Sequence, residues 1–262
     1  LAEAFGSMLP VGSKVYLSRD YHKSSRMLKR AFFSGMLSSG INVVDLKITP
    51  SNVVRFGIKE GKDVVAGVHF RQSIINQQNT EILFFTNEGL HIDTNTEKNC
   101  ERVFFRESFR RVNFDEIGEI SEKTNIKEKY KKALLKKVNI DVINAKKPKI
   151  AVDLSFGSTS DVYPEIVNAL NIDNIILNAY ADDKKLNKLP ATMQKSKDDL
   201  SKIVKHLEMD MAFLIYPNGQ KLEIICNDGE NTEPHITLLA VLKLLNLTSK
   251  DKKTKVLLPV SA

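Results

Sequence analysis

Several side chains that could bind an anion lie within one segment of eight residues. The segment S-R-D-Y-H-K-S-S spans residues 18–25 and contains Arg19, His22 and Lys23. Such cations bind phosphate through charge-assisted hydrogen bonds, and serine hydroxyls add further donors. These three residues are therefore candidate phosphate ligands. For Ser24, Ser25 and Asp20 a purely structural role is equally open, because serine commonly caps helices and aspartate commonly forms turns.

The elements around this segment predict where it lies. Residues 14–17 and 41–46 are short apolar runs typical of buried strands, and an apolar face at helical spacing runs between them, with Ser24 or Ser25 as its expected cap. A strand–helix–strand unit predicts parallel strands, whose carboxyl ends are the usual ligand sites of open α/β sheets. Arg71 follows a further predicted strand, residues 63–70. Since neighbouring strands lie about 5 Å apart, Arg19, His22, Lys23 and Arg71 are expected to form one basic lip.

The same segment resembles a known family. S-R-D-Y-H-K-S-S is similar to the G-R-D-x-R-x-S-S segment of the α-D-phosphohexomutases, the phosphomannomutase and phosphoglucomutase enzymes, with Ser18 in place of the glycine and His22 in place of the second arginine. The likeness continues through the order of strands and helices to about residue 260. The resemblance implies intramolecular phosphate transfer on a sugar, through a phosphoserine and Mg²⁺.

Pattern and resemblance agree on the fold. Alternating strands and helices predict an α/β protein with two tandem three-layer α/β/α sandwiches, whose sheets are mixed but mostly parallel. A hairpin at residues 217–219 makes the second sheet mixed, because strands joined by a tight turn are antiparallel. We expect a first domain at 1–118, a second at 119–253 and the start of a truncated third at 254–262. The chain is expected to be part of a longer protein.

The phosphoserine of the family has one candidate position here. The family places it in T-A-S-H-N-P, followed by N-G-x-K, whereas this chain has A-G-V-H-F-R-Q-S-I-I-N-Q-Q-N-T-E-I from residue 66. Alignment on Gly67 gives Ser73 and alignment on Asn79 gives Gln72; we favour Ser73, with a plain loop serine as the more ordinary interpretation. Ile82 stands at the lysine position. A serine without a base or a metal is a weak nucleophile, so we expect no stable phosphate on Ser73.

The cation site of the family lacks its carboxylates in this chain. The family binds Mg²⁺ with three aspartates in D-G-D-x-D-R, and the corresponding turn here is Y-P-N-G-Q-K, with Tyr216, Asn218 and Gln220 at the aspartate positions and Lys221 at the arginine position. A hard cation needs several oxygen ligands that carry negative charge. The sequence therefore predicts no metal and no cofactor.

Composition restricts the other function classes. The chain has 262 residues, a formal net charge of +7, and no apolar run long enough to span a membrane. Its lysines concentrate in three segments, 127–138, 146–149 and 250–255, without an RNA- or DNA-binding motif. Nucleic-acid binding is thus a minor alternative. Cys100 and Cys226 match no metal spacing and indicate a reducing compartment, so we expect a cytoplasmic protein.

Two functions remain in competition. The favoured one is a catalytically degenerate phosphomutase-like module that binds sugar phosphate weakly or acts as a scaffold, because the three carboxylates and the lysine of the family are missing. Residues 102–118 resemble a segment of the phosphomutase-like region fused to mannose-1-phosphate guanylyltransferases. The expected partners of the module are an upstream nucleotidyltransferase domain and the further C-terminal domains of the same protein. The alternative is an active phosphohexomutase that uses Ser73.

Overall fold

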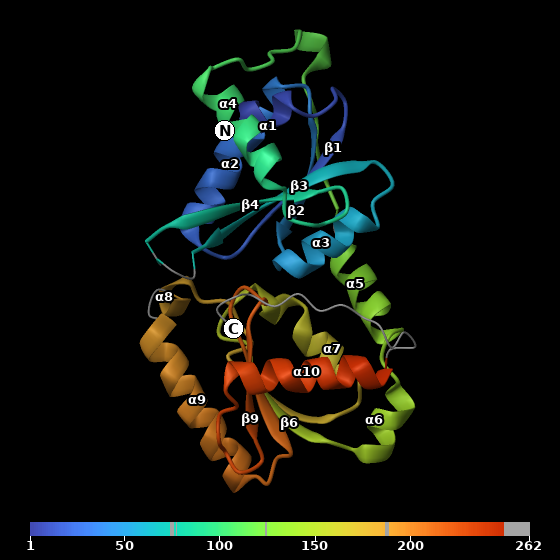
Figure 1. The fold of residues 1–262 in the computed structure, drawn as a ribbon, viewed down its shortest axis with the longest axis vertical. Coiled ribbons are helices and arrows are strands. Elements are labelled where there is room, and N and C mark those ends of the chain that lie inside the picture. Colours follow the sequence, from blue (N-terminus) through green and yellow to red (C-terminus); the bar gives the residue numbers. More distant parts are fainter. Residues whose placement is uncertain (74–75, 77, 124, 187–188, 249–262) are drawn as a thin grey trace.

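The chain folds into two units, each built from one β-sheet covered by helices. The computed structural model describes residues 1–73, 76, 78–123, 125–186 and 189–248. Figure 1 shows the first sheet with its helices above the second sheet, with the two units meeting at their facing ends. The α/β class with mixed, mostly parallel sheets is confirmed.

The first sheet has five strands, four of them parallel. In spatial order they are β4 (Thr80–Thr86), β3 (Val64–Gln72), β1 (Lys14–Arg19), β2 (Asn42–Ile48) and β5 (Ile120–Glu122). Only β4 is antiparallel, because a short loop joins it to β3. The central strand β1 is apolar and buried on both faces, as expected where helices cover a parallel sheet.

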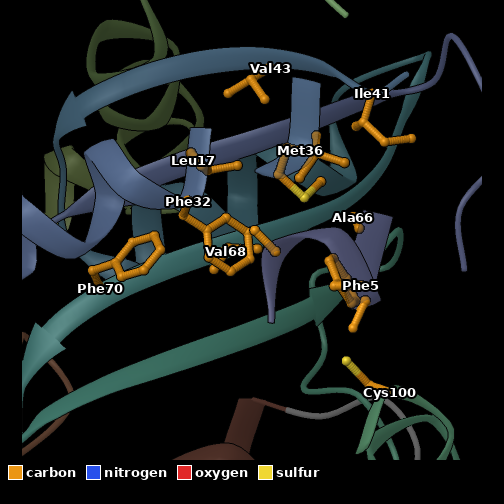
Figure 2. Close-up of a cluster of buried hydrophobic side chains, with 13 residues drawn as sticks. Phe5, Leu17, Phe32, Met36, Ile41, Val43, Ala66, Val68, Phe70 and Cys100 are labelled. Atoms are coloured by element: carbon orange, nitrogen blue, oxygen red, sulfur yellow. The ribbon is translucent and has the colours of Figure 1, made fainter. Parts of the chain in front are cut away.

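Helices cover both faces of this sheet. One face carries α1 (Ala2–Ser7), α2 (Lys23–Ser38) and α4 (Thr94–Phe105), and the other carries α3 (Ser51–Lys59) and α5 (Ile126–Leu135). Figure 2 shows the α2 side, where Phe32 of the helix lies beside Phe70 of β3. Their ring centroids are 5.3 Å apart at an edge-on angle of 72°. Each buried ring of this kind contributes roughly 2 kcal/mol through the apolar area it removes from water.

The second sheet has four strands and its own helices. Its spatial order is β7 (Asp173–Leu177), β6 (Lys149–Asp153), β8 (Met211–Ile215) and β9 (Leu222–Cys226), and only β9 is antiparallel. The helix α9 (Leu189–His206) covers one face, where Leu200 and Val204 are fully buried. The remaining helices of this unit are α6 (Ile140–Lys146), α7 (Tyr163–Ala169), α8 (Asp183–Leu186) and α10 (Pro234–Thr248).

The boundary between the two units differs from the one expected at residue 118. The strand β5 pairs with β2 in the first sheet although it begins at Ile120, and Ile126 of α5 belongs to the hydrophobic cluster on the α3 side. Val162 and Ile166, from the second unit, complete that cluster. The first sheet and its cover therefore extend well beyond residue 118, and the units share an apolar interface. Residues 254–262, the expected third domain, lie outside the described part. No described helix is long and apolar enough to cross a membrane.

Candidate functional site

The loops that follow the strands of the two sheets meet between the two units. From the first unit come residues 20–22, after β1, and the end of β3 with Ser73; from the second come residues 154–157, after β6, and the β8–β9 turn, residues 216–221. Carboxyl ends of parallel strands converge in this way in open α/β sheets. The candidate site is therefore the place where these four segments approach one another (Figure 1).

Asp20 fixes two of these loops to each other. Its Oδ1 accepts a hydrogen bond from the backbone N–H of His22 at 2.9 Å, and its Oδ2 accepts one from the N–H of Gln72 at 2.7 Å. The carboxylate thus joins the start of α2 to the end of β3. Asp20 positions the loops, in agreement with the turn-forming role considered for it.

The expected basic lip does not exist as one surface. Arg19 pairs in register with Phe70, so the two side chains share the α2 face, and Arg71, one residue further, points to the opposite face. Burial and the neighbouring Arg26 of α2 lower the pKa of the Arg19 guanidinium, as expected on that face. The prediction failed because β3 continues to Gln72, so Arg71 lies within the strand and not after it.

His22 and Lys23 lie on the α2 side with Arg19. His22 is the N-cap of α2 with extended backbone angles, and its Nδ1 is 2.7 Å from Ser24 Oγ, which in turn is hydrogen-bonded to Thr80. Lys23 is the first residue of the helix and is exposed. Neither serine caps α2 as predicted, and Ser25 is fully buried. The first turn of α2 therefore carries an imidazole, an ammonium group and a hydroxyl.

Ser73 lies on the other face, beside a carboxylate that the sequence analysis did not single out. Its Oγ donates to Oε1 of Glu81 at 2.7 Å, and the backbone N–H of Asn76 donates to Oγ at 3.3 Å. Ser73 is only 6% exposed. Glu81 pairs with Arg71 across the β3–β4 hairpin, so both side chains share a face. Ser73 therefore has a base within hydrogen-bond distance, contrary to the expectation of an unassisted hydroxyl.

Arg71 connects this pair to the second unit. Its Nε and Nη2 lie 2.7 Å from Oε2 of Glu81, and its Nη1 donates to Oε1 of Gln220 in the β8–β9 turn. Arg71 is 9% exposed. A guanidinium that offers several donors in one plane can contact two acceptors at once. Arg71 thus bridges the serine-bearing hairpin and the turn associated with a cation in the family.

The turn itself is held by neutral and basic groups. Gln220 Nε2 donates to Ser51 Oγ at 3.0 Å, and Asn218 Oδ1 accepts the N–H of Gln220 at 3.1 Å. Ile82, at the family's lysine position, packs in the α2-side core and not at the site. Among the residues that the structure describes, no three His, Cys, Asp or Glu side chains form a possible metal cluster. Tyr216, Asn218 and Gln220 stand at the three aspartate positions of the family. Of these, Gln220 already accepts a hydrogen bond from the cationic side chain of Arg71.

One carboxylate, Glu223, lies directly behind the turn. Lys197 Nζ is 2.6 Å from its Oε2, and the Tyr216 hydroxyl donates to its Oε1 at 2.5 Å. Burial alone would raise the pKa of Glu223, but hydrogen bonds from Lys197 and Tyr216 lower it to about 2. Glu223 therefore stays ionised with both oxygens occupied by protein donors.

Close contacts fix the two units at the site. The Tyr21 hydroxyl donates to Oδ1 of Asp161 at 2.5 Å, and Lys127 Nζ lies 2.8 Å from Oδ2. Burial, followed by the hydrogen bond to Asp161, raises the pKa of Tyr21. Gly157 lies against the β8–β9 turn, where an added Cβ would be 2.3 Å from the backbone of Pro217.

Comparison with known proteins agrees with this architecture. Residues 1–111 match the family model of phosphoglucomutase/phosphomannomutase, alpha/beta/alpha domain I. A probable phosphoglucosamine mutase of Pyrococcus abyssi is 27% identical over 227 residues, which cover 87% of this chain and 49% of that protein. A phosphoglucosamine mutase of Dictyoglomus turgidum is 30% identical over 177 residues, which cover 67% of this chain and 39% of that protein. The chain thus spans about half the length, or less, of these relatives.

A solved structure shows the same fold. A phosphoglucomutase/phosphomannomutase family protein from Burkholderia thailandensis superimposes with a TM-score of 0.78 at 19% identity, covering 94% of this chain and 54% of that one. Together, the domain match and the mutase relatives support the α-D-phosphohexomutase superfamily as the class of this chain. Fusion to a nucleotidyltransferase is not shown.

Proposed function

We propose that this chain is a sugar-phosphate-binding module of the phosphohexomutase type that holds no divalent cation at its β8–β9 turn. The observation that carries the proposal is the hydrogen bond from Arg71 to Gln220. A guanidinium already supplies positive charge at the position where the family uses a cation. Mg²⁺ also requires about six oxygen ligands in near-ideal octahedral geometry, and Gln220 is already engaged. The cytoplasmic location expected from the sequence belongs to this proposal.

The ligand would bind where the loops of the first unit face the second unit. The first turn of α2 offers His22 and Lys23, and the positive end of the helix dipole attracts anions. Ser73 approaches from the other side of the strand ends. A few partly exposed contacts give weak affinity, of roughly millimolar Kd. The names of the relatives make glucosamine, glucose and mannose phosphates the sugars to test first.

The wider context is part of the same proposal. We expect further domains, including a sugar-1-phosphate nucleotidyltransferase, in the same protein, so that the module acts as a scaffold or binding part of sugar-nucleotide metabolism. The full reading frame tests this context directly, because it contains or lacks those domains. Nucleic-acid binding remains the weaker proposal; Lys127 and Lys131, two of the lysines behind it, form ion pairs with acidic side chains.

Nuclear magnetic resonance tests the binding site. Titration with glucosamine 6-phosphate should shift the amide signals of residues 22–24 and 71–73 in a saturable manner. Titration with glucosamine serves as the control and should leave these signals in place. Shifts of equal size with both compounds, or shifts confined to the α4 end of the first sheet, would contradict the proposal.

A second function is favoured by one observation, the 2.7 Å hydrogen bond from Ser73 to Glu81. A nucleophile needs an activating neighbour, and this carboxylate is one. An active phosphohexomutase that uses Ser73 would interconvert hexose 1- and 6-phosphates. A coupled assay of the full-length protein decides between the two functions, since a binding module gives no turnover.

A further inference from the structure

The two oxygens of Glu81 serve two different partners. Oε1 accepts the Ser73 hydroxyl at 2.7 Å, while Oε2 lies 2.7 Å from Nε and Nη2 of Arg71. The side chain of Glu81 is 28% exposed and that of Arg71 is 11% exposed. The carboxylate is therefore fixed in orientation by a cation, and its other oxygen is aimed at a hydroxyl.

This arrangement has the form of an activated nucleophile. In such sites the base lies within about 2.6–3.2 Å of the nucleophile and is oriented by a third group. Ser73, Glu81 and Arg71 satisfy both conditions. The N–H of Asn76, which donates to Oγ at 3.3 Å, would in addition stabilise negative charge that develops on that oxygen.

We propose that Glu81 is the base for phosphoryl transfer to Ser73, and that Arg71 supplies the positive charge for the transferred group without a metal ion. The proposal rests on the second of the two proposed functions, an active phosphohexomutase that uses Ser73, and deepens it by naming the base and the positive charge of that reaction. The donor class is a sugar bisphosphate. Neither Glu81 nor Arg71 occupies a position that the sequence resemblance connects with acid–base chemistry.

Atoms and charge balance in the transfer of the phosphoryl group to Ser73. Oγ of Ser73 forms a bond to phosphorus, and the bond between phosphorus and the sugar oxygen breaks, with its electron pair remaining on that oxygen. The Oγ proton passes to Oε1 of Glu81. The departing sugar oxygen takes one proton from water and leaves as a hydroxyl group, and Glu81 later returns its proton to solvent.

Proton transfer also explains how Arg71 becomes available. While Glu81 is ionised, it holds the guanidinium in an ion pair. Protonation of Glu81 removes that charge, and the guanidinium can then donate to the oxygens of the phosphoryl group on Ser73. Its contact with Gln220 keeps Arg71 directed toward the β8–β9 turn during this change.

Mass spectrometry of Ser73 tests the inference. The full chain is incubated with glucose 1,6-bisphosphate in EDTA, and the peptide that contains Ser73 is followed over time. We expect phosphorylation of Ser73 in EDTA at the same rate as with Mg²⁺. Glu81→Gln should slow it roughly 100-fold or more, the usual contribution of a general base. The matched control is Glu88→Gln at an exposed turn, which should keep the rate.

Each outcome separates this inference from the binding proposal. No phosphate on Ser73, or equal rates for the protein and Glu81→Gln, overturns the role of Glu81, while saturable sugar-phosphate binding would still support the binding site. A rate that requires Mg²⁺ overturns the role of Arg71. If Glu81→Gln does not fold, Glu81→Asp takes its place; it keeps the charge but withdraws the carboxylate by one methylene, and a misplacement of that size should cost roughly 100-fold.

Discussion

Gln220 binds the first unit through both atoms of its amide. Its Oε1 accepts the Nη1 hydrogen bond of Arg71, and its Nε2 donates to Ser51 Oγ at the start of α3, at 3.0 Å. In the phosphohexomutases that this chain resembles, the corresponding turn holds a cation. In this chain the turn is instead attached to β3 and α3 of the first unit. The contact sets the distance between the Ser73 hairpin and the β8–β9 turn.

Replacement of Gln220 by leucine should weaken the interface. Gln220→Leu removes one hydrogen bond from a charged donor and one to a neutral hydroxyl, and we expect a loss of about 2 kcal/mol in the free energy of unfolding. Urea denaturation measures it. The control is Gln194→Leu, an exposed glutamine of α9 with one surface hydrogen bond, which should change stability by less than about 0.5 kcal/mol. Equal losses in the two variants would contradict the interdomain role of Gln220.

Gly157 should tolerate no side chain. Gly157→Ala places a Cβ 2.3 Å from the backbone of Pro217, so the β8–β9 turn must move. Overpacking of this kind costs about 1–3 kcal/mol. Thermal unfolding compares it with Gly12→Ala, where a positive φ of 76° is strained but no atom lies within 4 Å of the added Cβ. Weakening of sugar-phosphate binding by Gly157→Ala but not by Gly12→Ala would support the position of the turn at the site, and the reverse would contradict it.

His69 should make the fold sensitive to acid. It is 2% exposed, with Nδ1 2.8 Å from Ser18 Oγ, and burial followed by the charge of Arg71 lowers its pKa from 6.5 to about 3. The unfolded chain therefore binds this proton more readily than the folded chain does. The stabilisation is complete above pH 6.5 and is lost as the pH falls toward 3, at about 1.4 kcal/mol per pH unit.

The variant His69→Gln isolates this effect. Glu223, whose pKa is lowered to about 2, also loses its stabilisation as the pH falls below 4.5, but it does so in both proteins. The pH slope of the free energy of unfolding should be smaller in His69→Gln than in the unchanged protein. The exposed His206→Gln is the control and should keep the original slope. Equal slopes in all three proteins would show that His69 does not titrate as its burial requires.

Lys23 should contribute to ligand binding. It is the exposed first residue of α2, and loss of one charge-assisted contact should weaken sugar-phosphate binding roughly tenfold. Calorimetry of Lys23→Met measures the change, and Lys59→Met, at the exposed end of α3, is the control. If the two variants bind alike, the phosphate does not lie at the first turn of α2.

Much of the fold could be predicted because local patterns determine it. Apolar runs located the strands, and Asn218-Gly219 located the β8–β9 hairpin, where Gly219 has the positive φ of 69° that such turns need. The helix α3 was missed, since its apolar residues in V-V-R-F-G-I lie next to predicted strands and give a short, ambiguous run. The strand β5 was missed because it has three residues and exists only by pairing with β2.

The site could be predicted only in part because side-chain direction depends on register. Ser73 and Arg71 were recognised from the sequence, but Glu81 was not, since its position opposite Arg71 requires the pairing of β3 with β4. A shift by one residue reverses the face of every side chain in a strand. For the same reason Arg19, which pairs with Phe70, lies on the opposite face of the sheet from Arg71. Spacing along the chain therefore identified the residue types at the site but not their faces.

The account depends most on the claim that the β8–β9 turn binds no divalent cation while the site still binds sugar phosphate. Isothermal titration calorimetry tests both parts on one protein, first with Mg²⁺ alone and then with glucosamine 6-phosphate in EDTA and in Mg²⁺. We predict no saturable heat with Mg²⁺, and a sugar-phosphate Kd in the millimolar range that is the same under both conditions. Sub-millimolar Mg²⁺ binding that is lost in Gln220→Leu, or sugar-phosphate binding that appears only with Mg²⁺, would contradict the account.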